Sequence, residues 1–166
     1  MKKFKIKKST IILLLLNILT FTLVFSYFTS NDGSTNENGG LTVDSNAAEW
    51  RGEQEIERGK SATDKIAIPG WDCIYIKSDT TSQKVNFYNP QENNCLFLIT
   101  LYIEDEDVWK SGYIKPGYGY YDITLSKEFK PGEYTGGLKI RCFKESGEEL
   151  NSAKVTFKVI VQGDKR

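Results

Sequence analysis

The sequence predicts an all-β domain of seven or eight strands, preceded by one N-terminal transmembrane helix. Three observations predict this organisation. An apolar segment follows the N-terminal lysines, a polar segment follows the apolar one, and from residue 65 apolar and polar side chains alternate between short turn sequences. Many short strands at such spacing are typical of an antiparallel sandwich or barrel, and about 100 residues suffice to close one core.

Residues 11–28 form the expected membrane segment. They read IILLLLNILTFTLVFSYF, and thirteen of these eighteen residues are Ile, Leu, Val or Phe. Eighteen helical residues are about 27 Å long, close to the roughly 30 Å hydrocarbon thickness of a bilayer. Residues 1–10 carry five lysines and no acid, so the positive-inside rule predicts a cytoplasmic N-terminus and an extracellular C-terminal domain.

Cleavage of this segment is a separate question. Signal peptidase requires small residues just before the cleaved bond, and the bulky Tyr27 and Phe28 lie at the exit of the apolar run. We therefore expect an uncleaved signal anchor in the cell membrane, with a cleaved signal peptide as the alternative and a buried core helix as the least expected outcome. The first two place the β domain outside the cytoplasm.

Residues 29–63 link the anchor to the domain. Up to residue 46 they are rich in Asn, Gly, Ser and Thr and have too few large apolar groups to fold, which predicts a flexible tether. Residues 47–63 are ambiguous, because charge and alanine favour a short helix whereas two glycines oppose one. They are expected to form either a helical spacer or a segment that docks Trp50 onto the domain.

The β domain is expected over residues 64–163. Its clearest strand has apolar side chains at 155, 157, 159 and 161, as expected for a strand with one solvated face. Residues 95–104 are apolar on both parities, which predicts a central strand covered on both faces. The expected strands are 65–68, 73–77, 84–88, 95–104, 108–114, 120–125, 138–143 and 154–161.

One motif refines the fold class. The sequence FKPGEY, residues 129–134, resembles the tyrosine corner of immunoglobulin-like sandwiches, in which a Tyr at the start of a late strand hydrogen-bonds the preceding turn. Cys142 follows on the strand that Tyr134 opens, and Cys95 lies on the central strand before it. These features favour an immunoglobulin-like antiparallel β-sandwich.

A wider resemblance covers roughly residues 65–162. The succession IAIPGW, VNFYNPQENNCLFLITLYI, SGYIKPG and LNSAKVTFKVIV resembles a recurrent small extracytoplasmic domain of low-GC Gram-positive bacteria. In such proteins an N-terminal anchor precedes one β-sandwich domain. The resemblance therefore implies a fold and a location, and it assigns no activity.

The three cysteines leave two interpretations open. Cys95 and Cys142 both fall on the apolar parity of expected core strands, so they form either an inter-sheet disulfide or two free buried thiols. A disulfide would close a loop of about 47 residues and contribute about 4 kcal/mol. Cys73 is left over, and because the chain has no His to act as a base, we expect an inert thiol. The cysteines lack a CxxC spacing, so no metal site and no other cofactor is expected.

Two clusters are candidates for binding. Aromatic residues concentrate between residues 109 and 121, and flat rings with polar tips are a common means by which β modules bind sugars or proteins, although half of them could equally pack in the core. The four consecutive acids at residues 104–107 could supply oxygen ligands for Ca²⁺, but the EF-hand spacing is absent and a charged hairpin turn is expected instead. The candidate binding residues are Trp109, Tyr113, Tyr118, Tyr120 and Tyr121.

Composition and motifs argue against several function classes. The 22 basic and 22 acidic residues give a formal charge of zero, which excludes the uniformly basic surface that nucleic acid selects. The chain has no His and no Walker A, GxGxxG, GxSxG or HExxH motif, so no catalytic residue is expected. We expect a noncatalytic protein-interaction or structural module that contacts another protein of the cell envelope. A carbohydrate-binding module for cell-wall glycan is the alternative, and a thiol enzyme centred on Cys73 is the least expected.

Overall fold

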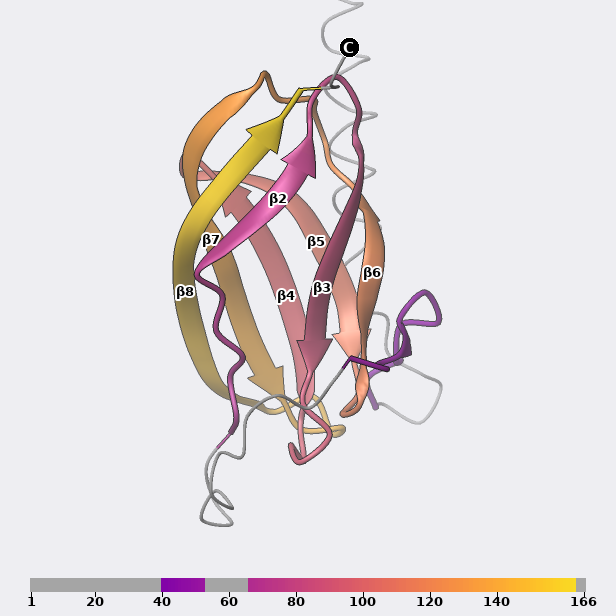
Figure 1. The fold of residues 1–166 in the computed structure, drawn as a ribbon. Coiled ribbons are helices and arrows are strands. Elements are labelled where there is room, and N and C mark those ends of the chain that lie inside the picture. Colours follow the sequence, from indigo (N-terminus) through magenta and orange to yellow (C-terminus); the bar gives the residue numbers. More distant parts are fainter. Residues whose placement is uncertain (1–39, 53–65, 164–166) are drawn as a thin grey trace, which may run out of the picture. The chain divides into compact units, whose positions relative to one another are not determined.

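The computed structural model describes residues 40–52 and 66–163. These residues form eight β-strands and no helix (Figure 1), which confirms the prediction of an all-β domain. The predicted membrane segment, residues 11–28, lies outside the described residues. No helix within the described ranges is long and apolar enough to cross a bilayer.

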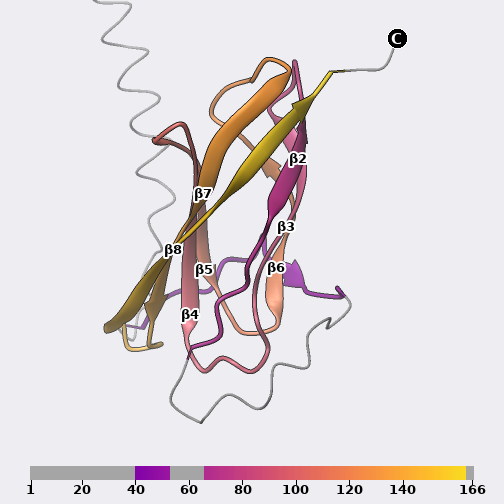
Figure 2. The same cartoon turned by 60° about the vertical axis from the view of Figure 1, so that its left-hand side comes forward.

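The strands form two sheets, one of five strands in the order β2-β8-β7-β4-β5 and one of three strands in the order β1-β6-β3. Figure 2 shows β4, β5 and β7 on one side of the domain and β3 and β6 on the other. All neighbours are antiparallel except β2 and β8, which run parallel, whereas the sequence favoured antiparallel pairing throughout. The bounds are β1 Ala48–Glu49, β2 Cys73–Lys77, β3 Ser82–Asn89, β4 Leu96–Ile103, β5 Glu106–Ile114, β6 Tyr118–Thr124, β7 Gly132–Phe143 and β8 Glu149–Gln162.

Alternation along the strands supplies the core between the sheets. On β8, Phe157 and Val159 are buried and Lys158 between them is exposed, as the sequence predicts. β4 is buried on both faces, because its outer face is covered at one end by Tyr113 and Phe143. Burying each large apolar side chain contributes about 1.5–3 kcal/mol, so this core holds the two sheets together. The core residues of lowest exposure include Phe87, Phe97, Ile99, Leu101, Ile103, Ile114, Leu138, Ile140 and Val159.

Two predicted turns are confirmed. The Tyr134 hydroxyl donates a hydrogen bond to the Lys130 carbonyl oxygen at 3.0 Å, which is the contact that the tyrosine-corner motif predicts. The acidic cluster begins with a tight turn between β4 and β5, where Glu104 and Asp105 have φ angles of 50° and 64°. Asp tolerates this left-handed conformation better than most residues. The side chains of residues 104–107 are exposed, as expected of a charged hairpin.

The strand expected at residues 65–68 is absent from the described part of this segment, residues 66–68. The Ala67 amide donates to the Asn93 side-chain oxygen at 2.7 Å, and the Asn93 side-chain nitrogen donates to the Ala67 carbonyl at 2.9 Å. A single asparagine therefore takes both backbone hydrogen bonds of Ala67 that a neighbouring strand would otherwise supply. The apolar alternation is still used, because Ile66 and Ile68 pack against the core.

Candidate functional site

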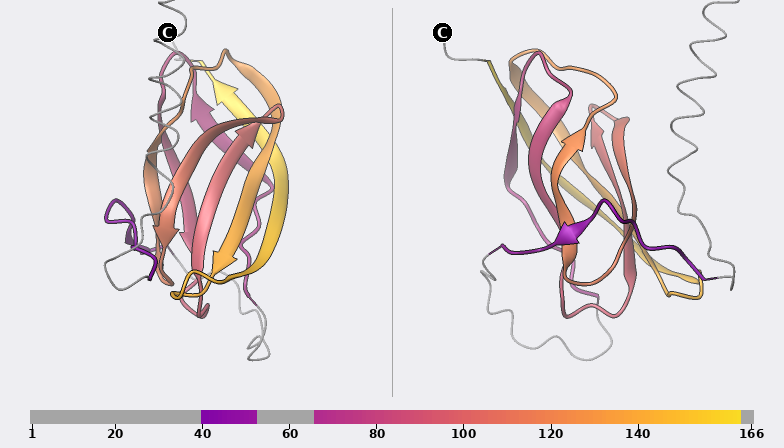
Figure 3. Two further views of the ribbon diagram at one scale, coloured as in Figure 1. Left: turned by 180° about the vertical axis from the view of Figure 1, so that it is seen from behind. Right: turned by 90° about the vertical axis from the view of Figure 1, so that its right-hand side faces the viewer.

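A segment ahead of the predicted domain lies across it. Residues 40–52, here called the N-terminal strap, run past the edges of β5 and β6 (Figure 3). The Leu41 amide donates to the Glu145 carbonyl at 3.0 Å, and the Asp44 amide donates to the Tyr113 carbonyl at 2.8 Å. Farther along, β1 pairs with Tyr118 and Gly119 of β6. The strap therefore covers the side of the domain where the edge strand of one sheet meets the other sheet.

Asp44 is the main polar attachment of the strap. One oxygen of its carboxylate accepts hydrogen bonds from the Gly112 amide, at 2.8 Å, and from the Tyr120 hydroxyl, while the other accepts from the Asn46 amide at 2.8 Å. Burial and, after it, this carboxylate raise the pKa of Tyr120 well above its usual value, so the hydroxyl remains a donor at all physiological pH values. Asp44 thereby joins the strap to both β5 and β6.

The end of the strap forms an aromatic surface on the three-stranded sheet. The Trp50 indole stacks on Tyr88 of β3, with ring centroids 4.0 Å apart and planes 13° apart. Its nitrogen donates to the Asn86 side-chain oxygen at 2.8 Å, and the Arg51 amide donates to the Tyr121 hydroxyl at 2.6 Å. We call Trp50, Arg51, Asn86, Tyr88 and Tyr121 the Trp50 surface. The predicted alternative in which Trp50 docks onto the domain is confirmed.

A depression of about 380 Å³ adjoins the Trp50 surface. It is open to solvent, and its lining combines the acidic Glu49 and the basic Arg51 with Tyr121. Small-molecule sites enclose most of their ligand, whereas this open recess is better suited to the projecting side chains of a partner. The lining residues are Ala48, Glu49, Arg51, Gly52 and Tyr121.

The structure brings two of the five predicted binding residues together inside the domain. Trp109 and Tyr120 meet edge to face with ring centroids 5.0 Å apart, and Trp109 also contacts Phe87 of the opposite sheet at 6.0 Å. Only 9% of Tyr120 is exposed. These two rings therefore close the core between β5 and β6 beneath the strap.

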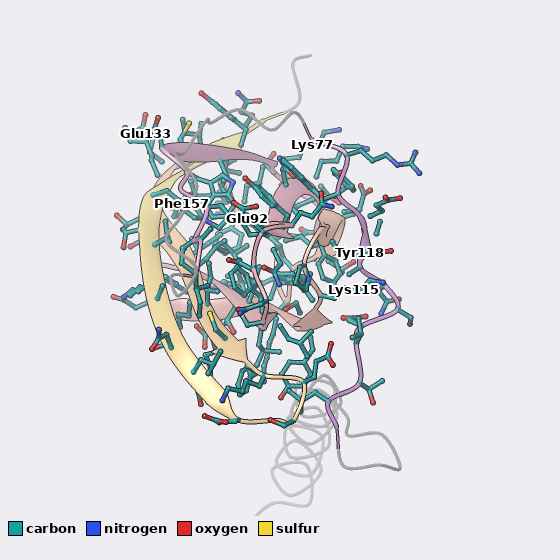
Figure 4. All side chains as sticks on the ribbon, turned by 90° about the horizontal axis from the view of Figure 1, so that it is seen from below. Lys77, Glu92, Lys115, Tyr118, Glu133 and Phe157 are labelled. Carbon is teal, nitrogen blue, oxygen red and sulfur yellow. The ribbon has the colours of Figure 1, made fainter. Side chains whose placement is uncertain are left out.

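The other three predicted residues lie at separate places. Tyr113 packs edge to face on Phe143, on the outer face of the five-stranded sheet. Tyr118 lies beside Lys115, whose amine is 3.9 Å from the ring centroid (Figure 4). Tyr121 belongs to the Trp50 surface and to its depression. The five residues are therefore not displayed as one continuous aromatic face.

Sequence reasoning missed Tyr88 and Asn86 as site residues. Both are on the parity of β3 that faces away from the core, where Asn86 is exposed and Tyr88 half-buried. The available signal was Tyr88 itself, an aromatic residue at a position of β3 whose side chain faces solvent. Its partner Trp50 comes from a segment that the sequence left ambiguous, so the stacking itself had no signal.

The cysteines lie in two places. Cys95 immediately precedes β4, and Cys142 on β7 is paired with Phe97 of the adjacent β4. A bond between them would join neighbouring strands of one sheet, so the expected inter-sheet location is wrong, because β4 and β7 pair directly. All three thiols are free, and Cys73 lies beside Tyr75 on the outer face of β2. The described residues contain no group of three or more His, Cys, Asp or Glu placed to hold a metal ion.

Alkaline pH is expected to destabilise the domain. Burial raises the pKa of Cys142 to about 12 and also raises the pKa of Cys95 and Tyr120. An unfolded thiol ionises near pH 8.5, so at higher pH the folded state retains protons that the unfolded state loses. For each thiol this stabilisation is complete below about pH 8 and is lost by up to about 1.4 kcal/mol per pH unit as the pH rises towards the folded pKa, whereas for Tyr120 the loss begins only near pH 10.

Urea unfolding of the reduced protein at pH 7.5 and pH 10.5 measures this effect. The double substitution Cys95→Ala, Cys142→Ala removes two of the three groups and should flatten the pH dependence, although it creates small cavities and lowers stability at both pH values. Equal unfolding free energies of the wild-type protein at the two pH values would contradict the prediction.

Comparison with known proteins identifies no matching protein family, no matching curated protein and no matching solved structure.

Proposed function

We propose that this protein is a membrane-anchored, extracytoplasmic, noncatalytic module that binds another protein of the cell envelope through the Trp50 surface. The stacked Trp50 and Tyr88 beside an open depression are the observation that carries this proposal. Trp, Tyr and Arg are the residue types that most often dominate the energy of protein interfaces. The hydrogen bonds from Trp50 to Asn86 and from the Arg51 amide to Tyr121 hold the surface in one conformation before binding, which lowers the entropy cost of association.

The proposed fold is an immunoglobulin-like sandwich. The strand orders β2-β8-β7-β4-β5 and β1-β6-β3, with the parallel β2–β8 pair, support it, as does the Tyr134 hydrogen bond in the tyrosine-corner motif. Sandwiches of this kind serve many unrelated functions through their faces, edges and loops. The binding assignment therefore rests on the Trp50 surface, and the fold supplies a rigid support for it.

The proposed location follows from residues 11–28 and the lysines before them. An apolar run of this length partitions into a bilayer, and the lysines keep its N-terminal end in the cytoplasm. In cells, the full chain is expected in the membrane fraction after alkaline carbonate extraction, at the mass of 18.9 kDa. External protease should remove the β domain from intact cells stripped of their wall. Recovery of the full chain in the cytosol would overturn the proposed location.

A protein partner is favoured over a glycan by how the aromatic rings are used. One face of the Trp50 indole is occupied by Tyr88, Gly52 lies so close to the ring that a Cβ atom there would collide with it, and Trp109 is packed between Phe87 and Tyr120. Sugar binding by aromatic stacking needs a free ring face. The Trp50 surface instead combines ring edges, amide groups and the exposed Arg51 around a recess, which suits the side chains of a protein.

Site-specific photocrosslinking tests the partner. A photoreactive phenylalanine analogue at Glu49, in the lining of the depression, is expected to yield one discrete protein adduct in intact cells. The same analogue at Glu128, an exposed position between β6 and β7, serves as the matched control. The substitution Arg51→Glu should lower the yield at Glu49 about tenfold, because loss of an interface hot spot of about 1.4 kcal/mol or more weakens affinity by that factor.

Two results would overturn the proposed function. Identical adducts at both positions, or no protein adduct at either, would remove the Trp50 surface as a protein-binding site. Retention of the purified domain on isolated cell-wall glycan, lost on Arg51→Glu, would assign the same surface to carbohydrate instead. Unfolding midpoints of the Arg51→Glu variant confirm that the domain remains folded.

A further inference from the structure

We propose that Cys95 and Cys142 form an intramolecular disulfide bond when the domain folds in an oxidising compartment. Both thiols belong to the buried core, with exposed fractions of 2% and 1%. They lie at one end of the five-stranded sheet, where β4 begins and β7 ends. The proposal concerns the chemistry of the fold and is independent of what the Trp50 surface binds.

The strand register places the two thiols on the same face. Phe97 is directly opposite Cys142, and Cys95 precedes Phe97 by two residues, so Cys95 is the diagonal neighbour of Cys142 on the core side. Each thiol also influences the pKa of the other, as expected of neighbouring groups on one face. A diagonal pair in a regular ladder is somewhat too far apart for a disulfide. Cys95, however, lies in a bend just before the first paired residue, Leu96, so its backbone departs from the regular ladder and the spacing of a regular diagonal pair does not apply to it.

Cys73 is excluded as a partner by its place in the sheet. It pairs with the exposed Lys158 of β8 and contacts Tyr75, of which 57% is exposed, so it faces outward. Cys142 faces the core, and β8 separates β2 from β7. Oxidation is therefore expected to produce one disulfide and to leave Cys73 as a thiol.

Burial determines when the bond forms. In the folded domain both thiols are shielded, and burial raises their pKa, so few thiolates are present to react. The Cys95 carbonyl also accepts a hydrogen bond at 2.8 Å from Asn89, which holds the bend in place. Oxidation is therefore expected to be fast during folding and slow afterwards, when it requires the end of the sheet to open.

Glutathione disulfide is the oxidant used in the test. The thiolate of one cysteine attacks a glutathione sulfur, forming a mixed disulfide and releasing one glutathione thiolate. The second cysteine, after giving its proton to water, attacks the protein sulfur of the mixed disulfide and releases the second glutathione. The protein loses two hydrogens, and one glutathione disulfide becomes two glutathione thiols.

The experiment compares refolding with native oxidation. Protein unfolded and reduced in urea is diluted into a buffer with glutathione and glutathione disulfide, and reduced native protein is placed in the same buffer. Peptide mass mapping is expected to find the Cys95–Cys142 bond and alkylated Cys73 after refolding, with at least tenfold slower conversion of the native sample. The oxidised domain should melt about 10 °C or more above the reduced one.

Controls separate this bond from other outcomes. Cys73→Ser is expected to leave the bond and the melting shift intact, whereas Cys142→Ala should abolish both. Glutathione mixed disulfides in place of the internal bond, persistent thiols at Cys95 and Cys142 after refolding, or a bond to Cys73 would each overturn the proposal. These results come from wild-type protein, so they hold even if the Cys142→Ala variant does not fold.

Protein isolated from cells under alkylating conditions provides a second arm, and this arm alone rests on the proposed extracytoplasmic location. An alkylated thiol pair in cells together with efficient oxidation during refolding would place the domain in a reducing compartment. That result would overturn the location and leave the pairing of Cys95 with Cys142 standing.

Discussion

The substitution Asn89→Ala is expected to lower the free energy of unfolding by about 3 kcal/mol. Asn89 is fully buried, and its side-chain nitrogen donates to the carbonyls of Cys95 and Ile114 at 2.8 and 2.9 Å. Its side-chain oxygen accepts from Asn93 at 2.8 Å. Alanine leaves two carbonyl oxygens and one amide group without these partners, and each unsatisfied buried group costs about 1–3 kcal/mol. Urea denaturation monitored by tryptophan fluorescence measures the loss.

The position of Asn89 explains why so much depends on one amide. It connects the end of β3 to the start of β4 and to the end of β5, while Asn93 extends the network to Ala67. Segments from three parts of the chain thus share one hydrogen-bond network at this end of the domain. Such a buried network is stable only while every member has a partner.

Two variants make the test specific. Asn94→Ala, at an exposed neighbouring position, should change the unfolding free energy by less than about 0.5 kcal/mol. Asn89→Asp keeps the size of the side chain but cannot donate to the two carbonyls when ionised, and it should be at least as unstable at pH 7 as Asn89→Ala. A change below about 1 kcal/mol for Asn89→Ala would show that the carbonyls find other donors.

Much of the strand arrangement was predictable because apolar alternation is a local signal. The bounds Cys73–Lys77 were predicted to the residue, and β3, β4, β5 and β6 were each found within two residues, whereas β8 begins five residues before the expected start. The buried parity of β8 was also correct. The tyrosine corner succeeded for the same reason, since the Tyr134 hydroxyl bonds a carbonyl only four residues away. The parallel β2–β8 pair had no such signal, because its two strands lie far apart in the sequence.

The candidate site was much less predictable. Trp50 donates to Asn86, 36 residues away, and Asp44 accepts from Tyr120, 76 residues away. Residues 40–46 have only two large apolar side chains, Leu41 and Val43, so the sequence predicted a tether. The structure holds them by individual hydrogen bonds to distant strands and by the packing of Leu41 on the outer face of the five-stranded sheet. Composition alone could not distinguish this strap from a flexible linker.

β7 shows the remaining limit of local reasoning and leads to the second large effect. The strand was expected from residue 138, but it begins at Gly132. The earlier start was not predicted, because the sequence GEYTGG has no apolar alternation. Gly136 and Gly137 have no side chains that favour a strand, and they are strand residues because they pair with β4 on one side and with β8 on the other. Tyr102 of β4, directly opposite Gly137, lies against it and hydrogen-bonds Thr156 of β8 at 3.0 Å. An aromatic ring thus covers the space that a side chain of Gly137 would occupy.

The substitution Gly137→Ala is therefore expected to lower the free energy of unfolding by about 3 kcal/mol and the melting temperature by roughly 15 °C. A Cβ atom at this position would collide with the Val155 carbonyl oxygen and lie 2.5 Å from the Tyr102 hydroxyl oxygen. The carbonyl belongs to the paired strand β8 and cannot rotate away, so β7 and β8 must separate locally. Calorimetry of the reduced wild-type and variant proteins measures the change.

Gly70→Ala is the matched control, because a Cβ atom at Gly70 would meet nothing within 4 Å. It should change stability by less than about 0.5 kcal/mol. The double substitution Gly137→Ala, Tyr102→Phe removes the hydroxyl but not the carbonyl clash, so it should recover only a minor part of the loss. Full recovery of stability in the double variant would show that the Tyr102 ring, and not the Val155 carbonyl, causes the clash. A Gly137→Ala variant as stable as the wild type would show that β7 and β8 do not pack as closely as the structure has them.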